Sequence, residues 1–161
     1  MNNRNNVVHG QEIDTLLDQQ LETADNKILF FTTYQPLSGE IKSNKIAKHL
    51  KTSVKSALFD QLHNHPLTAK LEKLPQKIWS ELEPKLYKIE NFHSGLAVFI
   101  KFDRTKQQPL AIDLIPLVKK VDRKTYLGPS YDLGQLIWMK NLSTLGLILN
   151  LRQKKATIYL L

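Results

Sequence analysis

The chain contains a nearly continuous apolar run at residues 95–102, Gly-Leu-Ala-Val-Phe-Ile-Lys-Phe. β-Branched and aromatic residues dominate the run, and near its middle both alternating faces are largely apolar. A strand with two apolar faces is typical of the interior of a sheet that is covered on both sides. We therefore predict a central strand here. The polar residues 103–106 predict a turn that reaches solvent after it.

Three further runs have the composition of strands. Residues 27–34 are rich in β-branched and aromatic side chains, and residues 110–114 alternate apolar and polar positions. The second of these runs predicts an antiparallel partner for the central strand, ended by Pro116. Residues 125–127 predict a short fourth strand, which Gly128 and the following proline would stop.

Four segments carry apolar residues at the spacing of one helix face. The four apolar stripes are Ile13, Leu16, Leu17 and Leu21; Ile46, Leu50, Val54 and Leu58; Leu71, Leu74, Ile78, Leu82 and Leu86; and Leu133, Leu136, Ile137 and Met139. Pro75 and Pro84 fall inside the third pattern, which predicts either two short helices or one kinked helix.

The predicted helix ends follow from capping residues and charges. Residues 1–9 are expected to be a frayed tail, with Glu12 and Asp14 near the N-terminus of the first helix. Ser43 or Asn44 is expected to cap the second helix, and Ser130 the last one.

Residues 145–151 and 156–160 alternate again, on either side of the basic turn at 152–155. The whole pattern predicts an α+β fold, namely a mostly antiparallel four-stranded sheet with helices packed on it, plus a C-terminal β-hairpin. A hairpin without a covering element has an apolar face and an open edge. We therefore expect the chain to be a fragment cut inside its second domain, and the exposed hairpin edge allows a dimer.

The length of 161 residues fits one domain, or one domain and part of a second, and the 42% hydrophobic content is enough for a core. The chain has no cysteine, which excludes disulfides and thiolate metal sites and is compatible with a reducing cytoplasm. Its polar start does not resemble a signal peptide. No apolar run approaches the ~20 residues that a membrane span requires. We expect a cytoplasmic protein.

Lysine and arginine number 23 against 15 acidic residues, a net charge of +8. Such a charge either keeps a protein in solution or attracts a polyanion, most simply RNA. Lys45, Lys48, Lys51 and Lys55 fall together on one face of the second predicted helix, and residues 119–124 form a second basic segment. The helix face is either a solvated surface or a strip that follows phosphates.

Few residues suggest other chemistry. His63 and His65 are two residues apart, but no third ligand stands at a recognisable spacing, so a loop with incidental histidines is the favoured interpretation. Trp79 is expected in the core rather than as a platform for base stacking. Glu81 and Glu83 project in different directions on a helix. The sequence shows no nucleophile elbow, phosphate loop or paired catalytic carboxylates, so we expect no enzyme activity, no cofactor and no metal within these residues.

Several short segments carry a resemblance to a known family. The segments are Phe30–Pro36, Gly95–Phe99, Ala111–Pro116, Thr125–Leu127, Leu145–Leu149 and Ala156–Leu161. In this order they resemble the archaeal and eukaryotic class-1 peptide-chain release factors, and more closely the bacterial archaeo-eukaryotic release factors. The resemblance runs from about Lys27 to Leu161. It implies that residues 1–143 are a release-factor-like N-terminal domain and residues 144–161 the opening hairpin of a middle domain.

The chain departs from the motifs of true release factors. It contains no Gly-Gly-Gln, the family's loop for peptidyl-tRNA hydrolysis. The Tyr-x-Cys-x-x-x-Phe motif falls on residues 126–132, where Tyr126 matches but Gly128 and Asp132 replace the cysteine and the phenylalanine, and Tyr131 lies one position early. The Asn-Ile-Lys-Ser loop has only a partial counterpart at residues 53–56, inside a predicted helix.

The resemblance and the charge together predict a non-enzymatic, RNA-binding N-terminal domain of a bacterial release-factor-like protein. It would act at the ribosome in rescue, hibernation or termination-like work, with the ribosome, its rRNA or tRNA as partner. The predicted RNA-binding residues are Lys45, Lys48, Lys51, Lys55, Lys119, Lys120, Arg123, Lys124, Tyr126 and Tyr131. The alternative is a protein–protein interaction module with the same fold, which exposure of Trp138 and Met139 would favour.

Overall fold

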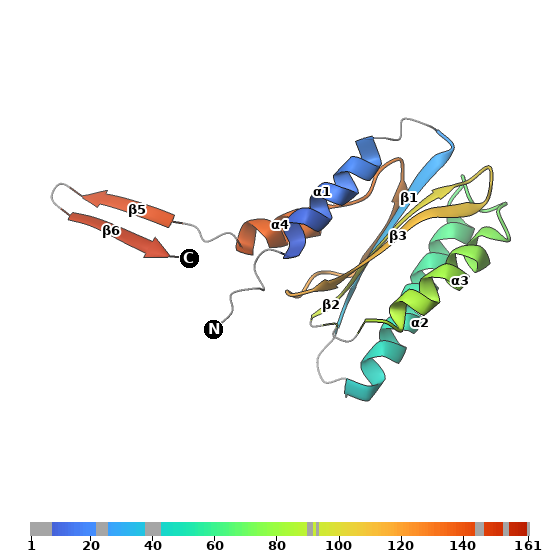
Figure 1. Ribbon diagram of the computed structural model, residues 1–161, viewed down its shortest axis with the longest axis horizontal. Coiled ribbons are helices and arrows are strands. Elements are labelled where there is room, and N and C mark those ends of the chain that lie inside the picture. Colours follow the sequence, from blue (N-terminus) through green and yellow to red (C-terminus); the bar gives the residue numbers. More distant parts are fainter. Residues whose placement is uncertain are drawn as a thin grey trace. The chain divides into compact units, whose positions relative to one another are not determined.

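The computed structural model describes residues 8–21, 26–37, 43–89, 92, 94–143, 147–152 and 155–160. Its elements, labelled in Figure 1, are α1 (Val8–Leu21), β1 (Ile28–Pro36), α2 (Ser43–Asn64), α3 (Leu74–Leu86), β2 (Gly95–Asp103), β3 (Gln108–Leu117), β4 (Lys124–Gly128), α4 (Gly134–Ser143), β5 (Leu147–Arg152) and β6 (Lys155–Leu160). No helix among these residues is both long enough and apolar enough to span a membrane.

The chain forms two compact units. One consists of residues 1–18 together with 133–161, and the other of residues 19–132. In the first unit Ile13, Leu16 and Met139 are buried, and β5 pairs antiparallel with β6. The division at residue 143 that the resemblance implies stays a prediction.

The second unit is built on a four-stranded antiparallel sheet of order β3-β2-β1-β4. This confirms the predicted α+β class, and β2 is an inner strand as its two apolar faces indicate. The other inner strand, β1, is buried from Leu29 to Gln35. Because β3 and β4 are the two edges, the segment 118–123 that joins them crosses the end of the sheet.

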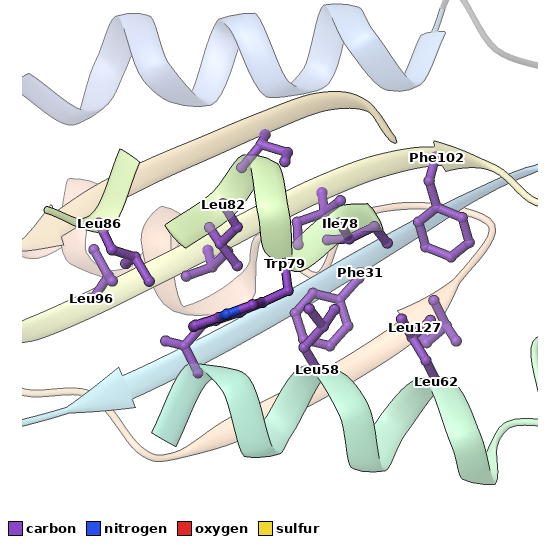
Figure 2. Packing of buried hydrophobic residues seen from close by; sticks show 14 of the residues in the cluster. Phe31, Leu58, Leu62, Ile78, Trp79, Leu82, Leu86, Leu96, Phe102 and Leu127 are labelled. Atoms are coloured by element: carbon purple, nitrogen blue, oxygen red, sulfur yellow. The ribbon is translucent and has the colours of Figure 1, made fainter. Parts of the chain in front are cut away.

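Helices α2 and α3 lie side by side on one face of this sheet, as Figure 1 shows. Helix α2 contacts β1, β2 and β4, whereas α3 contacts β3. Figure 2 shows the core between them, in which Leu58, Leu82 and Phe31 meet from α2, α3 and β1. The alternation of strand side chains places Leu29, Phe31, Thr33 and Gln35 of β1 on this face.

The opposite face of the sheet carries an aromatic cluster. Phe30 and Phe99 each meet the ring of Tyr131 edge-on, at centroid distances of 4.7 and 5.4 Å. Tyr34 meets Phe99 at 5.9 Å in the same arrangement, and its hydroxyl donates to the carbonyl of Asp132 at 2.7 Å. Edge-to-face pairs of this kind add about 0.5–1.5 kcal/mol each beyond burial of their area.

The structure corrects several predicted element ends. Helix α1 begins at Val8, inside the predicted tail, so its first turn contains no acidic residue. Helix α4 begins at Gly134, which is too far from Ser130 for the predicted cap. Strand β3 continues through Pro116 to Leu117. Proline is tolerated there because β3 is an edge strand, where a missing N–H on the outer side costs no ladder hydrogen bond.

The pattern with two prolines forms one helix, α3, that starts at Leu74. Pro75 lies in its first turn, where the backbone N–H has no partner within the helix, and Pro84 lies in its last turn. Two residues of the predicted apolar stripes, Leu17 and Ile137, are exposed. The predicted caps Ser43 and Asn44, and the side chains of the C-terminal strands, lie outside the described side chains.

Candidate nucleic-acid interface

The four lysines of the predicted strip lie on α2, as expected. Lys45, Lys48 and Lys55 are exposed, and Lys51 is half-buried. Successive positions of an α-helix are about 100° apart, so Lys48, Lys51 and Lys55 lie on one face of α2, next to the apolar stripe. We call Lys45, Lys48, Lys51 and Lys55 the lysine strip.

Lys51 is held by helix α3. Its ammonium forms a salt bridge with Glu83, donates to the Tyr87 hydroxyl at 2.5 Å, and lies 4.6 Å from the centre of the Tyr87 ring. The hydrogen bond between the two charged groups raises the pKa of Lys51 and lowers the pKa of Glu83. Lys51 therefore joins α2 to α3, and part of its charge is neutralised within the protein.

Lys55 lies over two aromatic rings. Its ammonium is 5.4 Å from the centre of the Trp79 ring and 5.7 Å from that of Phe59. Trp79 is 5% exposed and extends from α3 into the core beside α2 (Figure 2), as predicted. Cation–π contacts orient a lysine without removing its charge. Lys55 is thus an oriented, exposed cation.

The second basic segment is divided by strand alternation. Thr125 pairs with Thr33, on the sheet face that α2 covers, and Lys124 pairs with Tyr34 on the opposite face. Arg123 is exposed on the α2 side, whereas Lys124 forms a 2.5 Å salt bridge with Asp132. The structure therefore places Arg123, but not Lys124, on the sheet face that α2 covers. Arg123 lies there at the β4 edge, on the opposite flank of α2 from Lys51 and Lys55, which face α3.

Lys119 and Lys120 precede Arg123 in the segment that crosses the end of the sheet. Lys120 is exposed and Lys119 is half-buried. The same end of the sheet contains Pro36, the last residue of β1, and six residues separate Pro36 from the start of α2 at Ser43. The start of α2, which carries Lys45, and the crossing segment therefore both lie near this end of the sheet.

The two candidate stacking tyrosines lie elsewhere. Tyr126 is half-buried and its ring covers Gly128, where an added Cβ would clash with the Tyr126 hydroxyl. Tyr131 is 5% exposed, packed in the aromatic cluster, and its hydroxyl donates to Gln19 at 3.0 Å. Burial, with a smaller effect of the Asp113 charge, raises the pKa of Tyr131. In this conformation Tyr131 presents no ring face to a base.

A feature that the sequence analysis missed is a polar groove of about 550 Å³ between α2 and the β4 edge of the sheet. Ser56, Asp60 and Asn64 of α2 line it, opposite Gln35, Arg123 and Thr125. We call this cavity the polar groove. Gln35 is 2% exposed, and its Oε1 has no hydrogen-bond partner among the described residues. Its one sequence signal is a glutamine at the end of a strand whose other residues are apolar, aromatic or threonine.

The histidine pair is part of a helix end. Helix α2 stops at Asn64, and the backbone N–H of Leu67 donates to His65 Nδ1 at 3.3 Å. The part of the chain that the structure describes contains no cluster of three or more potential metal ligands from His, Cys, Asp and Glu.

Helix α4 presents two large apolar side chains to solvent. Trp138 is 53% exposed and Ile137 is 42% exposed, whereas the neighbouring Met139 is buried. Of the two residues expected to indicate a protein-binding surface, Trp138 alone is therefore available.

Comparison of this chain with protein-family models, with curated protein sequences and with solved structures finds no match. The release-factor resemblance therefore stays a prediction, and the functional argument depends on the geometry of the site.

Proposed function

We propose that this chain is a non-enzymatic, RNA-binding domain of a release-factor-like protein that acts at the ribosome in the cytoplasm. The observation that carries the proposal is the lysine strip, on a protein of net charge +8. The release-factor-like layout, with the C-terminal hairpin as the start of a second domain, belongs to the same proposal. Rescue, hibernation and termination-like roles all fit it.

Within this proposal the predicted residues contribute unequally. Lys45, Lys48 and Lys55 are exposed and contact phosphates, while Lys51 holds α2 against α3 through Glu83. Arg123 and Lys120 are exposed and form a second basic region, in the segment that crosses the end of the sheet. Lys124 and the two tyrosines do not belong to the proposed surface, because all three lie on the opposite face of the sheet.

One cation of the strip, Lys55, is oriented before binding, which favours its contact with a phosphate. A free lysine side chain loses rotamer entropy when it is fixed on a ligand. Lys55 is already held over Trp79 and Phe59. RNA binding through such contacts releases counterions, so its affinity falls steeply with salt.

A pair of charge-reversal variants tests the proposal. Lys45→Glu/Lys48→Glu and the control Arg104→Glu/Lys106→Glu both lower the net charge from +8 to +4, the control on the turn after β2. If two phosphate contacts are lost, the strip variant lowers the slope of log K against log salt by about 1.4 for single-stranded RNA. The control changes the slope by less than half of this.

The assay is fluorescence anisotropy with a labelled single-stranded RNA, together with co-sedimentation with ribosomes. Equal effects of the strip variant and the control would mean that RNA responds only to net charge. That result would refute the assignment of the lysine strip.

A second candidate function is a protein–protein interaction module, and the exposure of Trp138 favours it. Aromatic residues are enriched at interfaces, and truncating a central one often costs more than 2 kcal/mol of binding energy. If Trp138→Ala abolishes ribosome co-sedimentation while the strip variant leaves it unchanged, the partner is a protein surface rather than RNA.

A further inference from the structure

The polar groove has a floor made by residues of β1 and β4. Gln35 and Thr125 line it from the sheet, and both belong to the face on which α2 lies. Polar side chains buried on a strand normally satisfy their hydrogen bonds within the protein. The Oε1 atom of Gln35 accepts no hydrogen bond from the described residues. A ligand in the groove could supply the missing donor.

The direction of each hydrogen bond on the floor follows from the hydroxyl of Thr33. This hydroxyl donates to the carbonyl of Lys124 at 3.2 Å and accepts from Gln35 Nε2 at 2.8 Å. A hydroxyl has one hydrogen, so in its 3.0 Å contact with Thr125 the donor is Thr125. Thr125 then offers only lone pairs to a ligand. The sheet residues of the groove therefore contain two acceptors with unused lone pairs, namely Thr125 Oγ1 and, itself buried, Gln35 Oε1.

The walls of the polar groove supply one further acceptor and one cation. On α2 the Asp60 carboxylate accepts from the Ser56 hydroxyl at 2.9 Å and is a further acceptor. Arg123 supplies a guanidinium with five N–H donors and a permanent positive charge. A complementary ligand has N–H donors for the floor and an anionic group for Arg123.

We propose that the polar groove binds a nucleoside monophosphate whose base carries an exocyclic amino group. The amino group donates to the acceptors of the floor, after a small rotation of the Gln35 amide, and the phosphate contacts Arg123. The volume of about 550 Å³ lies within the range of small-molecule sites, roughly 300–1,000 Å³. The inference goes beyond the proposed function, because it requires neither the ribosome nor the lysine strip. The same chemistry serves a free nucleotide and a nucleotide within RNA.

Titration calorimetry of the 161-residue chain with AMP, CMP, GMP and UMP tests the base. UMP has the phosphate but no exocyclic amine, so at least one of the other three is expected to bind about fivefold or more tightly than UMP, which is the effect of one hydrogen bond. Equal affinity for all four, or no saturable binding of any at millimolar concentration, would overturn the proposal.

A second comparison tests the phosphate. Arg123 is exposed, so Arg123→Gln is expected to fold normally and to weaken the tightest-binding nucleotide about tenfold while leaving its nucleoside unchanged. The control Arg104→Gln, outside the groove, binds as the unmodified chain does. If Arg123→Gln also binds the nucleotide as the unmodified chain does, Arg123 does not hold the phosphate and the proposal is wrong.

Two further experiments test whether the nucleotide is free or part of RNA, and whether its binding is independent of the lysine strip. In the first experiment, the tightest-binding nucleotide competes with a six-residue single-stranded homopolymer of the same base. If the homopolymer displaces the nucleotide, RNA is the source; if the homopolymer does not bind, the ligand is a free nucleotide. The variant Lys45→Glu/Lys48→Glu is expected to retain full affinity for the free nucleotide even where it loses RNA. Loss of both would place the nucleotide on the strip instead of in the groove.

Discussion

Replacing Gly95 with alanine is expected to destabilise the sheet where β1, β2 and β3 come together. Gly95 has φ = 154° and pairs with Pro36 of β1 and Leu117 of β3. Its N–H donates to the carbonyl of Phe92 at 2.9 Å, so its backbone position is fixed from several sides.

The cost follows from where the new Cβ would lie. It would be 2.5 Å from the carbonyl oxygen of Gln35 and 3.0 Å from Cα of Pro36, and neither is a side chain that can rotate away. The unfavourable φ costs about 1–3 kcal/mol and the forced backbone shift a similar amount. The smaller entropy of the unfolded alanine chain offsets about 0.4–1 kcal/mol. The expected loss in the free energy of unfolding is about 2–4 kcal/mol.

Thermal unfolding followed by circular dichroism measures this loss. A change of 2–4 kcal/mol corresponds to a fall in Tm of roughly 6–15 °C for a unit of this size. The control is Ser94→Ala, which removes a 3.3 Å hydrogen bond to the carbonyl of Val118 and is expected to cost less than about 1 kcal/mol. An unchanged or raised Tm for Gly95→Ala would refute the close approach of β1 and β2 described above.

Three other predictions concern the packing and the titrating groups. Leu58 is fully buried between α2 and the sheet, so Leu58→Ala should cost about 2–5 kcal/mol in urea unfolding, and a loss below 1 kcal/mol would contradict that packing. Burial raises the pKa of Tyr131, so stability is present below about pH 10 and is lost as the pH rises further; Tyr131→Phe should show a smaller alkaline loss, and parallel pH profiles would contradict it. The pKa of Glu83 is lowered by Lys51, so stability is present above about pH 4.3 and is lost as the pH falls through the lower folded value. Glu83→Gln should lose less stability on acidification, and an acid limb as steep as that of the unmodified chain would count against the salt bridge.

The sequence was sufficient for the inner part of the fold because there the pattern is set by burial. The two apolar faces of residues 95–102 indicated an inner strand, and β2 is one. The stripe of α2 likewise faces the core, from Leu50 to Leu58. Pro116 misled the prediction of a strand end, because whether proline is tolerated depends on which strand is an edge. That property belongs to the pairing of the whole sheet.

The candidate site was predictable only in part. Helical spacing alone placed the lysine strip on one face, because that spacing is local. The division of Arg123 from Lys124 follows from strand alternation, and the burial of Tyr131 from contacts with Phe30 and Phe99 of two other segments. The polar groove depends on Gln35 and α2 being adjacent, which no local pattern encodes.

The central claim, that this chain binds RNA at the ribosome, is tested most directly by co-sedimentation with ribosomes at near-physiological salt. We predict that the chain pellets with ribosomes under these conditions, and that Lys45→Glu/Lys48→Glu remains in the supernatant while Arg104→Glu/Lys106→Glu pellets. If the unmodified chain pellets only at low salt, or the two variants behave alike, ribosome binding depends only on overall net charge and the proposed function is wrong.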